Sequence, residues 1–269
     1  MGSGSRWASL ALSSVAAKYA RPEELEDARR SVARGLDPDE AALVERLFDP
    51  GSRILDVGCG AGREAIALAR RGFQVTAIDL VPTLIELARL EAARAGVEVT
   101  FELKSVTALD YPPRSFDHVL FSPNVYAYIP SRRRRAETLG RVAVALREGG
   151  AVVLSAFNRR AIPRGLRDRL RDGVRVVLSG VSRNGSRPEA GDRWVRHVSE
   201  ASGPDAPLCF CHHATVEEVT EEIRQAGLVL AEITTYEELA QGARLTPDER
   251  ERIPTLIYLA RKPGAGRGS

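Results

Sequence analysis

A short apolar strand that ends in an acid and runs into closely spaced glycines constrains this chain more than any other feature. Residues 54–62 read ILDVGCGAG, and a helical pattern over Arg63–Arg71 follows directly. Because glycine has no Cβ, a ligand can lie against bare backbone where a strand turns into a helix. We therefore expect a ligand-binding turn at the carboxyl end of a buried strand.

The spacing of the glycines separates classes of nucleotide ligand. A dinucleotide-binding turn reads G-x-G-x-x-G and seats a pyrophosphate on the helix N-terminus. Here Asp56 precedes glycines at positions 58, 60 and 62. A carboxylate at that place repels a pyrophosphate and attracts a cation. The spacing predicts a nucleoside-like, phosphate-free and partly positive ligand, which S-adenosylmethionine satisfies, and it disfavours a dinucleotide dehydrogenase.

The chain alternates between strand and helix patterns from Arg53 onward. Helix starts are marked by prolines or by capping residues such as Ser131 and Thr215, and helix ends by glycines such as Gly96 and the pair Gly149-Gly150. Expected strands are Ile54–Val57, Gln74–Asp79, Val97–Leu103, Phe116–Ser122, Ala151–Phe157, Leu228–Thr234 and Thr255–Ala260. This alternation predicts an α/β fold with a doubly wound, mostly parallel, seven-stranded Rossmann-like sheet. Ligands then bind beyond the carboxyl ends of its strands.

Composition changes along the chain suggest its domain organisation. Residues 1–50 read as an N-terminal helical arm or cap, with helices at Pro22–Arg34 and Pro38–Phe48. Residues 51–157 and 209–262 form the expected core, and residues 263–269 a disordered tail. Between the two core segments, residues 158–208 hold eleven arginines against six acidic residues, although the whole chain carries a net charge of only +3. We expect this basic insertion to act as an acceptor lid.

Compartment and partners follow from composition. No apolar run reaches the roughly 18–20 residues that a membrane span requires, and the odd cysteine count of three indicates a reducing compartment. We therefore predict a cytoplasmic protein that does not bind a membrane. The small net charge argues against nucleic acid as a partner, and the sequence does not indicate an oligomeric state.

On these motifs, the chain from Arg53 to Ala260, apart from the insertion, resembles the class I S-adenosylmethionine-dependent methyltransferases. The resemblance implies S-adenosylmethionine as donor and S-adenosylhomocysteine as product. Asp79 follows Gly62 by 17 residues and is expected to bind the ribose hydroxyls. Lys104-Ser105-Val106 stands where many members have a Gly-Asp-Ala step, so the usual adenine-binding Asp is absent. The donor-binding residues that the resemblance implies are Asp56, Gly58, Cys59, Gly60, Gly62, Asp79, Leu80, Ser105, Val106 and Ser122.

The loop after the fourth expected strand is where donor and acceptor meet in this family. It reads Ser122-Pro123-Asn124-Val125, which differs from the [N/D]-P-P-[F/Y] tetrapeptide of methylases that modify bases or protein amides. We take Asn124, Tyr126 and Tyr128 as acceptor-binding candidates, because aromatic faces favour a cationic methyl group. Tyr126 is also a candidate catalytic residue, and a simple packed loop is the alternative.

Two adjacent histidines are the candidates for a general base. On a strand, His212 and His213 point to opposite faces, so at most one faces the site. We prefer His213, with a structural role as the alternative for both, and expect His118 to be a core residue. The run Cys209-Phe210-Cys211-His212-His213 also suits zinc in its ligand types. No second cluster completes a tetrahedral site, so no metal is predicted.

The insertion offers the remaining acceptor-binding candidates. Arg159, Arg160, Arg164 and Arg167 follow the fifth expected strand, and Trp194 would supply an apolar wall. A basic lid favours an anionic acceptor, while a solvated helix with a loop is the alternative.

These features predict a methyltransferase that acts on a small-molecule acceptor by in-line methyl transfer, and the basic insertion favours an anionic acceptor. Two alternatives stay open. One is an RNA methyltransferase, which only the arginine-rich insertion supports. The other is a donor-binding scaffold or regulator that has lost catalysis.

Overall fold

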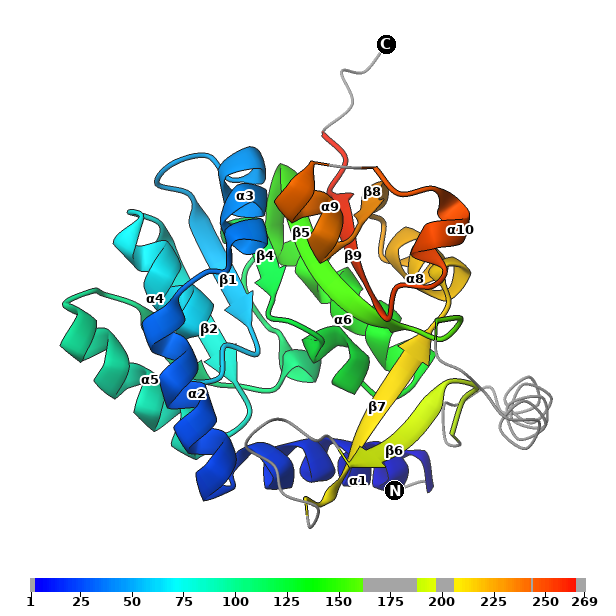
Figure 1. Cartoon of the computed structure of the whole chain (residues 1–269), viewed down its shortest axis with the longest axis horizontal. Coiled ribbons are helices and arrows are strands. Elements are labelled where there is room, and N and C mark those ends of the chain that lie inside the picture. The colour runs from blue at the N-terminus through cyan, green and yellow to red at the C-terminus, as the bar shows by residue number, and fades with distance from the viewer. Residues whose placement is uncertain (1–2, 162–187, 197–205, 243, 265–269) are drawn as a thin grey trace.

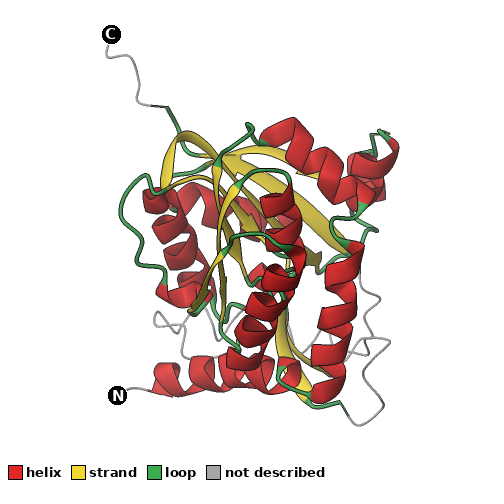
Figure 2. Cartoon of the chain, turned by 90° about the vertical axis from the view of Figure 1, so that its left-hand side faces the viewer, coloured by secondary structure: helices red, strands yellow, loops and turns green. Residues whose placement is uncertain are grey.

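The chain folds into a central sheet with helices on both sides (Figures 1 and 2). The computed structural model describes residues 3–161, 188–196, 206–242 and 244–264. The α/β class, with a mostly parallel sheet, agrees with the sequence prediction.

Nine strands belong to the sheet within the described residues. They are β1 (Arg53–Val57), β2 (Gln74–Asp79), β3 (Thr100–Leu103), β4 (Phe116–Phe121), β5 (Leu146–Asn158), β6 (Asp192–Arg196), β7 (Leu208–Ala214), β8 (Val229–Thr234) and β9 (Thr255–Arg261). The helices are α1 (Ser3–Tyr19), α2 (Pro22–Arg34), α3 (Pro38–Leu47), α4 (Arg63–Arg70), α5 (Pro82–Ala95), α6 (Arg132–Ala145), α8 (Val216–Gln225), α9 (Tyr236–Gln241) and α10 (Pro247–Arg250), with 3-10 turns η1 (Val106–Ala108) and η2 (Val125–Tyr128).

The sheet contains the seven expected strands and two more. Strands β3, β2, β1, β4 and β5 pair in parallel in that order, and β9 pairs antiparallel with both β5 and β8. The additional hairpin consists of β6 and β7, and the end of β7 pairs in parallel with the end of β5 through Phe157 and Asn158. The hairpin therefore extends the sheet beyond the carboxyl end of β4.

Helices cover both faces of the sheet and bury two apolar clusters. One cluster joins β1, β2, β5 and β9 to α3, α4 and α5, and the other joins β4, β5 and β9 to α6 and α8. The parallel strands are buried on both faces, as apolar strands between two helical layers should be. The site consequently rests on a rigid scaffold.

Helix α1 lies along the β6–β7 hairpin, below the carboxyl ends of the parallel strands in Figure 1. The backbone N–H of Phe210 on β7 donates to the Ser14 hydroxyl on α1 (3.0 Å), and the Trp7 ring meets the Phe210 ring edge-on. These contacts place the N-terminal helix over the end of the sheet where ligands are expected. Within the described residues, no helix combines the length and apolar character that crossing a bilayer requires.

The glycine pair Gly149-Gly150 does not end a helix, contrary to the sequence prediction. Helix α6 ends at Ala145, and β5 begins at once with Leu146 and includes both glycines. A Cβ at Gly150 would lie 2.6 Å from the Asp117 carbonyl oxygen on β4. The glycine therefore permits close approach of two strands rather than helix termination.

Two short helices near the C-terminus were not expected from the sequence. Thr235 caps α9, and Thr246 with Glu249 forms a capping box at α10. Threonine followed three residues later by glutamate is the usual sequence sign of such a start, and it stands at both places. That sign could have located both helices.

Candidate functional site

The glycine turn after β1 holds its backbone in conformations that L side chains rarely adopt. Gly58, Gly60 and Gly62 have φ of +79°, +53° and +89°. A Cβ at Gly58 would lie 2.3 Å from a methyl carbon of Val125, whereas a Cβ at Gly60 would have no described atom beyond its chain neighbours within 4 Å. Gly58 therefore allows the η2 segment to pack on the turn, and Gly60 borders open space.

Asp79, the last residue of β2, bonds to the turn. Its Oδ2 accepts the N–H of Gly60 (3.0 Å) and its Oδ1 accepts the N–H of Val81 (2.9 Å). Burial raises the pKa of this carboxyl, while the backbone N–H groups act in the opposite direction. The pairing of β1 with β2 therefore brings Asp79 next to the glycine turn, although Asp79 lies 17 residues after Gly62 in the sequence.

A cavity of about 170 Å³ lies between this turn and helix α1. The turn and the ends of β2, β3 and β4 form one wall, and α1 and η2 form the other. The lining residues are Leu12, Val15, Tyr19, Gly58, Gly60, Ile78, Asp79, Leu80, Val81, Leu84, Lys104, Val106, Pro123, Val125 and Tyr128. Glycine backbone, a carboxylate and apolar walls suit a ligand that is part nucleoside and part cation.

Two tyrosines from different elements meet at the wall of the cavity that α1 and η2 form. The hydroxyls of Tyr19 on α1 and Tyr128 on η2 lie 2.9 Å apart and share a hydrogen bond, with the rings edge to face. Burial raises the pKa of both hydroxyls, so both remain protonated at neutral pH. Tyr128 thus lies at the predicted place, and Tyr19 joins it from the N-terminal helix.

Asp56 and Ser122 lie together behind the turn. The Ser122 hydroxyl donates to Asp56 Oδ1 (2.8 Å), and within the described residues Asp56 Oδ2 has no hydrogen-bond partner. Burial, and then the neighbouring Glu64, raises the pKa of Asp56 well above its usual value. The Cys59 side chain is buried, which raises the pKa of its thiol. Neither Asp56 nor Cys59 lines the cavity.

The residues predicted around adenine separate into two groups. Leu80 and Val106 line the cavity. The Ser105 hydroxyl instead accepts the N–H of Thr107 (3.3 Å) and caps the turn η1. Lys104 occupies the cavity wall, where its ammonium pairs with Asp110 (2.7 Å).

Tyr126 points away from the cavity. Its ring is fully buried, and its hydroxyl donates to Glu222 on α8, which also pairs with Arg135 (2.8 Å). Asn124 has φ of +64°, and its N–H donates to the Ser155 hydroxyl (2.8 Å). Within the described residues, the buried Oδ1 of Asn124 has no partner. We therefore assign Tyr126 a packing role and keep Asn124 as an acceptor-side candidate.

The two histidines face opposite sides of β7, as alternation predicts. His213 lies on the same side as Cys211, with Nε2 3.4 Å from the Cys211 sulfur and its ring 5.2 Å from the Phe157 ring. Val15, Tyr128, Cys209 and Cys211 form an apolar cluster on that side, adjacent to the cavity. Of the two histidines, His213 is therefore the one on the cavity side.

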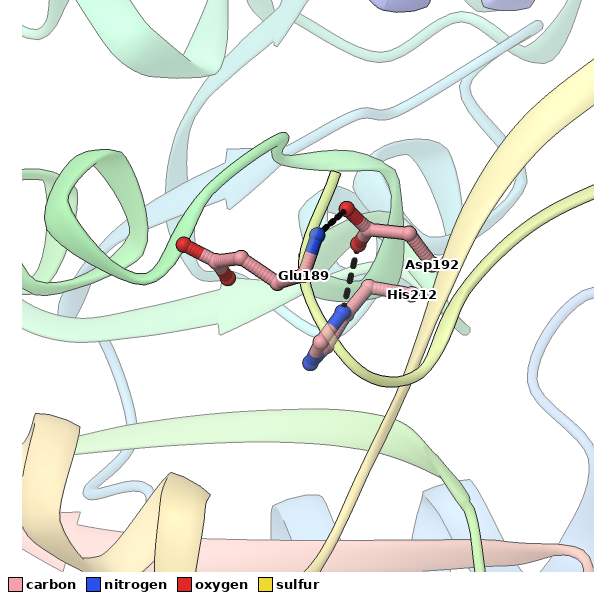
Figure 3. A group of neighbouring side chains, drawn as sticks. All are labelled: Glu189, Asp192 and His212. Atoms are coloured by element: carbon pink, nitrogen blue, oxygen red, sulfur yellow. Dashed lines mark hydrogen bonds and ion pairs between the residues drawn. The ribbon is translucent and has the colours of Figure 1, made fainter. Parts of the chain in front are cut away.

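His212 belongs to a polar cluster on the other face (Figure 3). Its Nδ1 lies 2.8 Å from Asp192 Oδ1, and burial lowers its pKa to about 3. One ligand atom each from Glu189, Asp192 and His212 lies within 4.8 Å of the others, a spacing that a metal could use. Glu189 is already engaged by the N–H of Arg132 (2.8 Å) and by the Arg135 guanidinium (3.3 Å).

These ion pairs and hydrogen bonds explain the cluster without a metal. A cation would have to sit beside the Arg135 guanidinium, which repels it. We interpret the cluster as a structural network of hydrogen bonds and ion pairs that holds residues 189–192 against α6 and β7. Within the described residues, no group of three ligands includes Cys209, Cys211 or His213.

The predicted lid residues that lie in the described part of the chain do not gather at the cavity. Arg160 is half-exposed and pairs with Glu217 (2.9 Å) and Glu251. Trp194 lies opposite Phe210 on the hairpin, on the face away from Cys209 and Cys211. Arg164, Arg167 and most of the rest of residues 158–208 lie outside the described residues.

The sequence reasoning missed the contribution of helix α1 to the cavity. Leu12, Val15 and Tyr19 recur at a spacing of three and four residues, which places them on one face of a helix. This spacing is a signal that the sequence does contain. It becomes meaningful only once α1 is known to lie against the glycine turn.

Comparisons with known proteins agree with this geometry. Residues 54–150 match the family described as methyltransferase domain. Ubiquinone biosynthesis O-methyltransferase of Xanthomonas campestris pv. campestris (strain B100) is 40% identical over 118 residues, which cover 44% of this chain and 48% of that protein. The protein of the same name from Xylella fastidiosa (strain M23) is 38% identical over 118 residues, covering 44% and 46%. The chain thus spans about half the length of the curated relatives it matches.

Solved structures share the fold over most of the chain. A methyltransferase dependent on S-adenosylmethionine from Methanosarcina mazei superposes with a TM-score of 0.63 at 20% identity, covering 86% of this chain and 99% of that one. The 1,6-didemethyltoxoflavin-N1-methyltransferase of Burkholderia thailandensis, solved with its substrate and S-adenosylhomocysteine, has a TM-score of 0.59 at 20% identity, covering 98% and 92%. At such identities the likeness supports the fold alone.

Proposed function

We propose that this chain, whose residues 54–150 match the methyltransferase domain family, is a class I methyltransferase that transfers a methyl group from S-adenosylmethionine to a small-molecule acceptor. The observation that carries the proposal is the cavity in which bare backbone at Gly58 and Gly60 meets the carboxylate of Asp79. Methyl transfer requires few protein groups, because the sulfonium is already a good leaving group and the enzyme mainly aligns the acceptor within about 3–3.5 Å.

In this proposal the donor lies with its ribose at Asp79 and its adenine at Leu80 and Val106. A carboxylate can accept from both ribose hydroxyls. Asp56 lies behind the glycine turn, where its buried Oδ2 has no hydrogen-bond partner within the described residues. Burial raises the pKa of this carboxyl, and the donor's positive groups would favour its ionised form. The open space at Gly60 supports passage of the donor over the turn.

Donor entry requires helix α1 to move. The cavity of about 170 Å³ is smaller than the roughly 300–1,000 Å³ of pockets that hold molecules of this size. Tyr19, Val15 and Leu12 on α1 form the wall that can withdraw, because α1 reaches β7 mainly through side-chain contacts. We therefore propose that α1 opens for the donor and closes over it, which would exclude water during transfer.

The acceptor would lie beside the cluster of Tyr128, Cys209, Cys211 and His213. His213 is our candidate base if the acceptor must lose a proton, because a neutral imidazole nitrogen can accept one. The relatives' name, ubiquinone biosynthesis O-methyltransferase, supports a small-molecule acceptor. We further propose an anionic acceptor, in-line transfer and a cytoplasmic location.

The test is a binding and product assay on the purified chain. We expect S-adenosylhomocysteine to bind in calorimetry, NAD not to bind, and release of S-adenosylhomocysteine to depend on small molecules rather than on RNA. NAD binding without S-adenosylhomocysteine binding would overturn the donor assignment. Release that requires RNA would overturn the acceptor class.

A further inference from the structure

Lys18 is a buried cation with few partners. Its side chain is 3% exposed. Within the described residues, its ammonium has Glu24 as ion-pair partner at 3.9 Å, with the Tyr19 ring centroid 4.4 Å away. An ammonium has three hydrogen-bond donors, and a buried charge is costly unless it is paired and hydrogen-bonded. A loose ion pair and an aromatic ring leave this ammonium able to bind another acceptor.

The place of Lys18 connects it to the proposed acceptor site. It lies on α1 one residue before Tyr19, which lines the cavity, and three after Val15, which belongs to the cluster with Tyr128 and the two cysteines of β7. Burial raises the pKa of Cys209 to about 11, and the positive charge of Lys18 opposes that rise. Lys18 itself does not line the cavity, and its charge acts on the Cys209 and Cys211 thiols of β7, next to the cavity.

Other cations around the fold are better satisfied. Arg135 pairs with Glu222 at 2.8 Å, Arg159 with Glu218 at 3.0 Å, Arg160 with Glu217 at 2.9 Å, and Lys104 with Asp110 at 2.7 Å. Each of these charges has a carboxylate within hydrogen-bond distance. Lys18 has its carboxylate at 3.9 Å. Of these five cations, Lys18 therefore has the most hydrogen-bonding capacity left for an incoming anion.

We propose that Lys18 determines acceptor specificity by binding an anionic oxygen, a carboxylate or a phenolate, of the molecule that receives the methyl group. This inference rests on the proposed function, because it places the acceptor between α1 and β7. A lysine ammonium is a point charge without planar geometry, so it serves either kind of oxygen. Burial lowers the pKa of Lys18, and the negative charge of Glu24 acts in the opposite direction. At 3.9 Å, Glu24 does not fill the hydrogen-bonding positions of the ammonium.

The experiment measures binding of matched probes to the protein loaded with S-adenosylhomocysteine. Benzoate and benzamide share a shape and differ in charge, and 4-nitrophenol at about pH 8 supplies a phenolate. We expect the wild-type protein to bind benzoate, 4-nitrophenolate or both about tenfold more tightly than benzamide. Lys18→Met, which keeps the apolar stem, should remove that preference, and Lys18→Arg should retain it. The benzoate and nitrophenolate arms distinguish the two kinds of oxygen.

Glu24→Gln is the matched control for a purely structural ion pair. If Lys18 binds the acceptor, this variant keeps the preference for anions or increases it, because the competing carboxylate is gone. Wild-type protein without a preference for either anion, or Lys18→Met with the preference intact, would overturn the proposal. Binding of S-adenosylhomocysteine to each variant verifies folding. Its failure in the wild-type protein would instead overturn the proposed function.

Discussion

Alanine at Gly58 and at Gly60 should have different consequences, although both positions have positive φ. The φ values of +79° and +53° mean that alanine at either position costs about 1–2 kcal/mol. At Gly58 the new Cβ would also lie 2.3 Å from one methyl carbon of Val125 and 2.8 Å from the other. Carbon atoms in contact lie about 3.5–4.0 Å apart, so one side must shift.

The overlap adds an overpacking cost of about 1–3 kcal/mol to the backbone cost. We therefore expect Gly58→Ala to lower the free energy of unfolding by about 2–5 kcal/mol and Gly60→Ala by about 1–2 kcal/mol. Gly60→Ala should instead act on the donor, because its Cβ enters the open space of the cavity. A tenfold or larger loss of affinity for S-adenosylhomocysteine corresponds to about 1.4 kcal/mol or more.

Urea unfolding followed by tryptophan fluorescence measures the first effect, and calorimetric titration with S-adenosylhomocysteine measures the second. Val125→Ala in the Gly58→Ala background removes the two overlapping methyl carbons. This second change should recover most of the unfolding free energy that the overlap had cost. Equal unfolding free energies for the two glycine variants would refute the packing argument. Wild-type affinity in Gly60→Ala would show that the donor does not pass over Gly60.

The remaining predictions concern binding, closure, stability and turnover. Asp79→Ala should weaken binding of S-adenosylhomocysteine at least about tenfold in calorimetry, and unchanged affinity would contradict its ribose role. Tyr19→Phe removes the hydrogen bond to Tyr128, worth about 0.5–1.5 kcal/mol, so S-adenosylhomocysteine should dissociate about 2–10-fold faster in stopped-flow measurements. An unchanged dissociation rate would show that the pair plays no part in closure. Burial lowers the pKa of His118 from 6.5 to about 4, so wild-type protein should lose unfolding free energy as the pH falls through that window. His118→Phe should make the urea midpoint less dependent on pH there, and an unchanged dependence would assign it to other groups. Replacing residues 162–187 by a short glycine-serine linker should spare donor binding and abolish turnover, and surviving turnover would exclude a lid.

The donor side of the site was predictable because its determinants are local. The glycine turn and Asp79 lie at the ends of strands whose apolar patterns are clear, and parallel pairing of β1 with β2 brings those ends together. The contact between Asp79 and Gly60 could therefore be predicted from the strand order alone. Where a role depends only on strand order and strand ends, the sequence is sufficient.

The acceptor side was not predictable to the same degree, because its residues meet through tertiary packing. Nothing in the pattern around Tyr126 distinguishes a ring that faces Glu222 from one that faces the cavity. Tyr19 and Lys18 became site candidates only because α1 lies along β7, which is more than 180 residues away in the chain. Strand β6 likewise lay inside the insertion, and its pairing with β7 was not predicted.

Several unusual local features lie together at the proposed site, which supports function there, although others lie elsewhere, such as positive φ at Arg114 and Ser131 and the buried ring nitrogens of His118. Positive φ at Gly58, Gly60 and the non-glycine Asn124 surrounds the end of β1 and β4. Two of the buried polar atoms without a partner in the described part of the chain, Asp56 Oδ2 and Asn124 Oδ1, lie on the same two strands or directly after them. Each such feature lowers the free energy of unfolding compared with regular backbone and fully hydrogen-bonded side chains. A folded chain keeps them together where a ligand, rather than the fold, uses them.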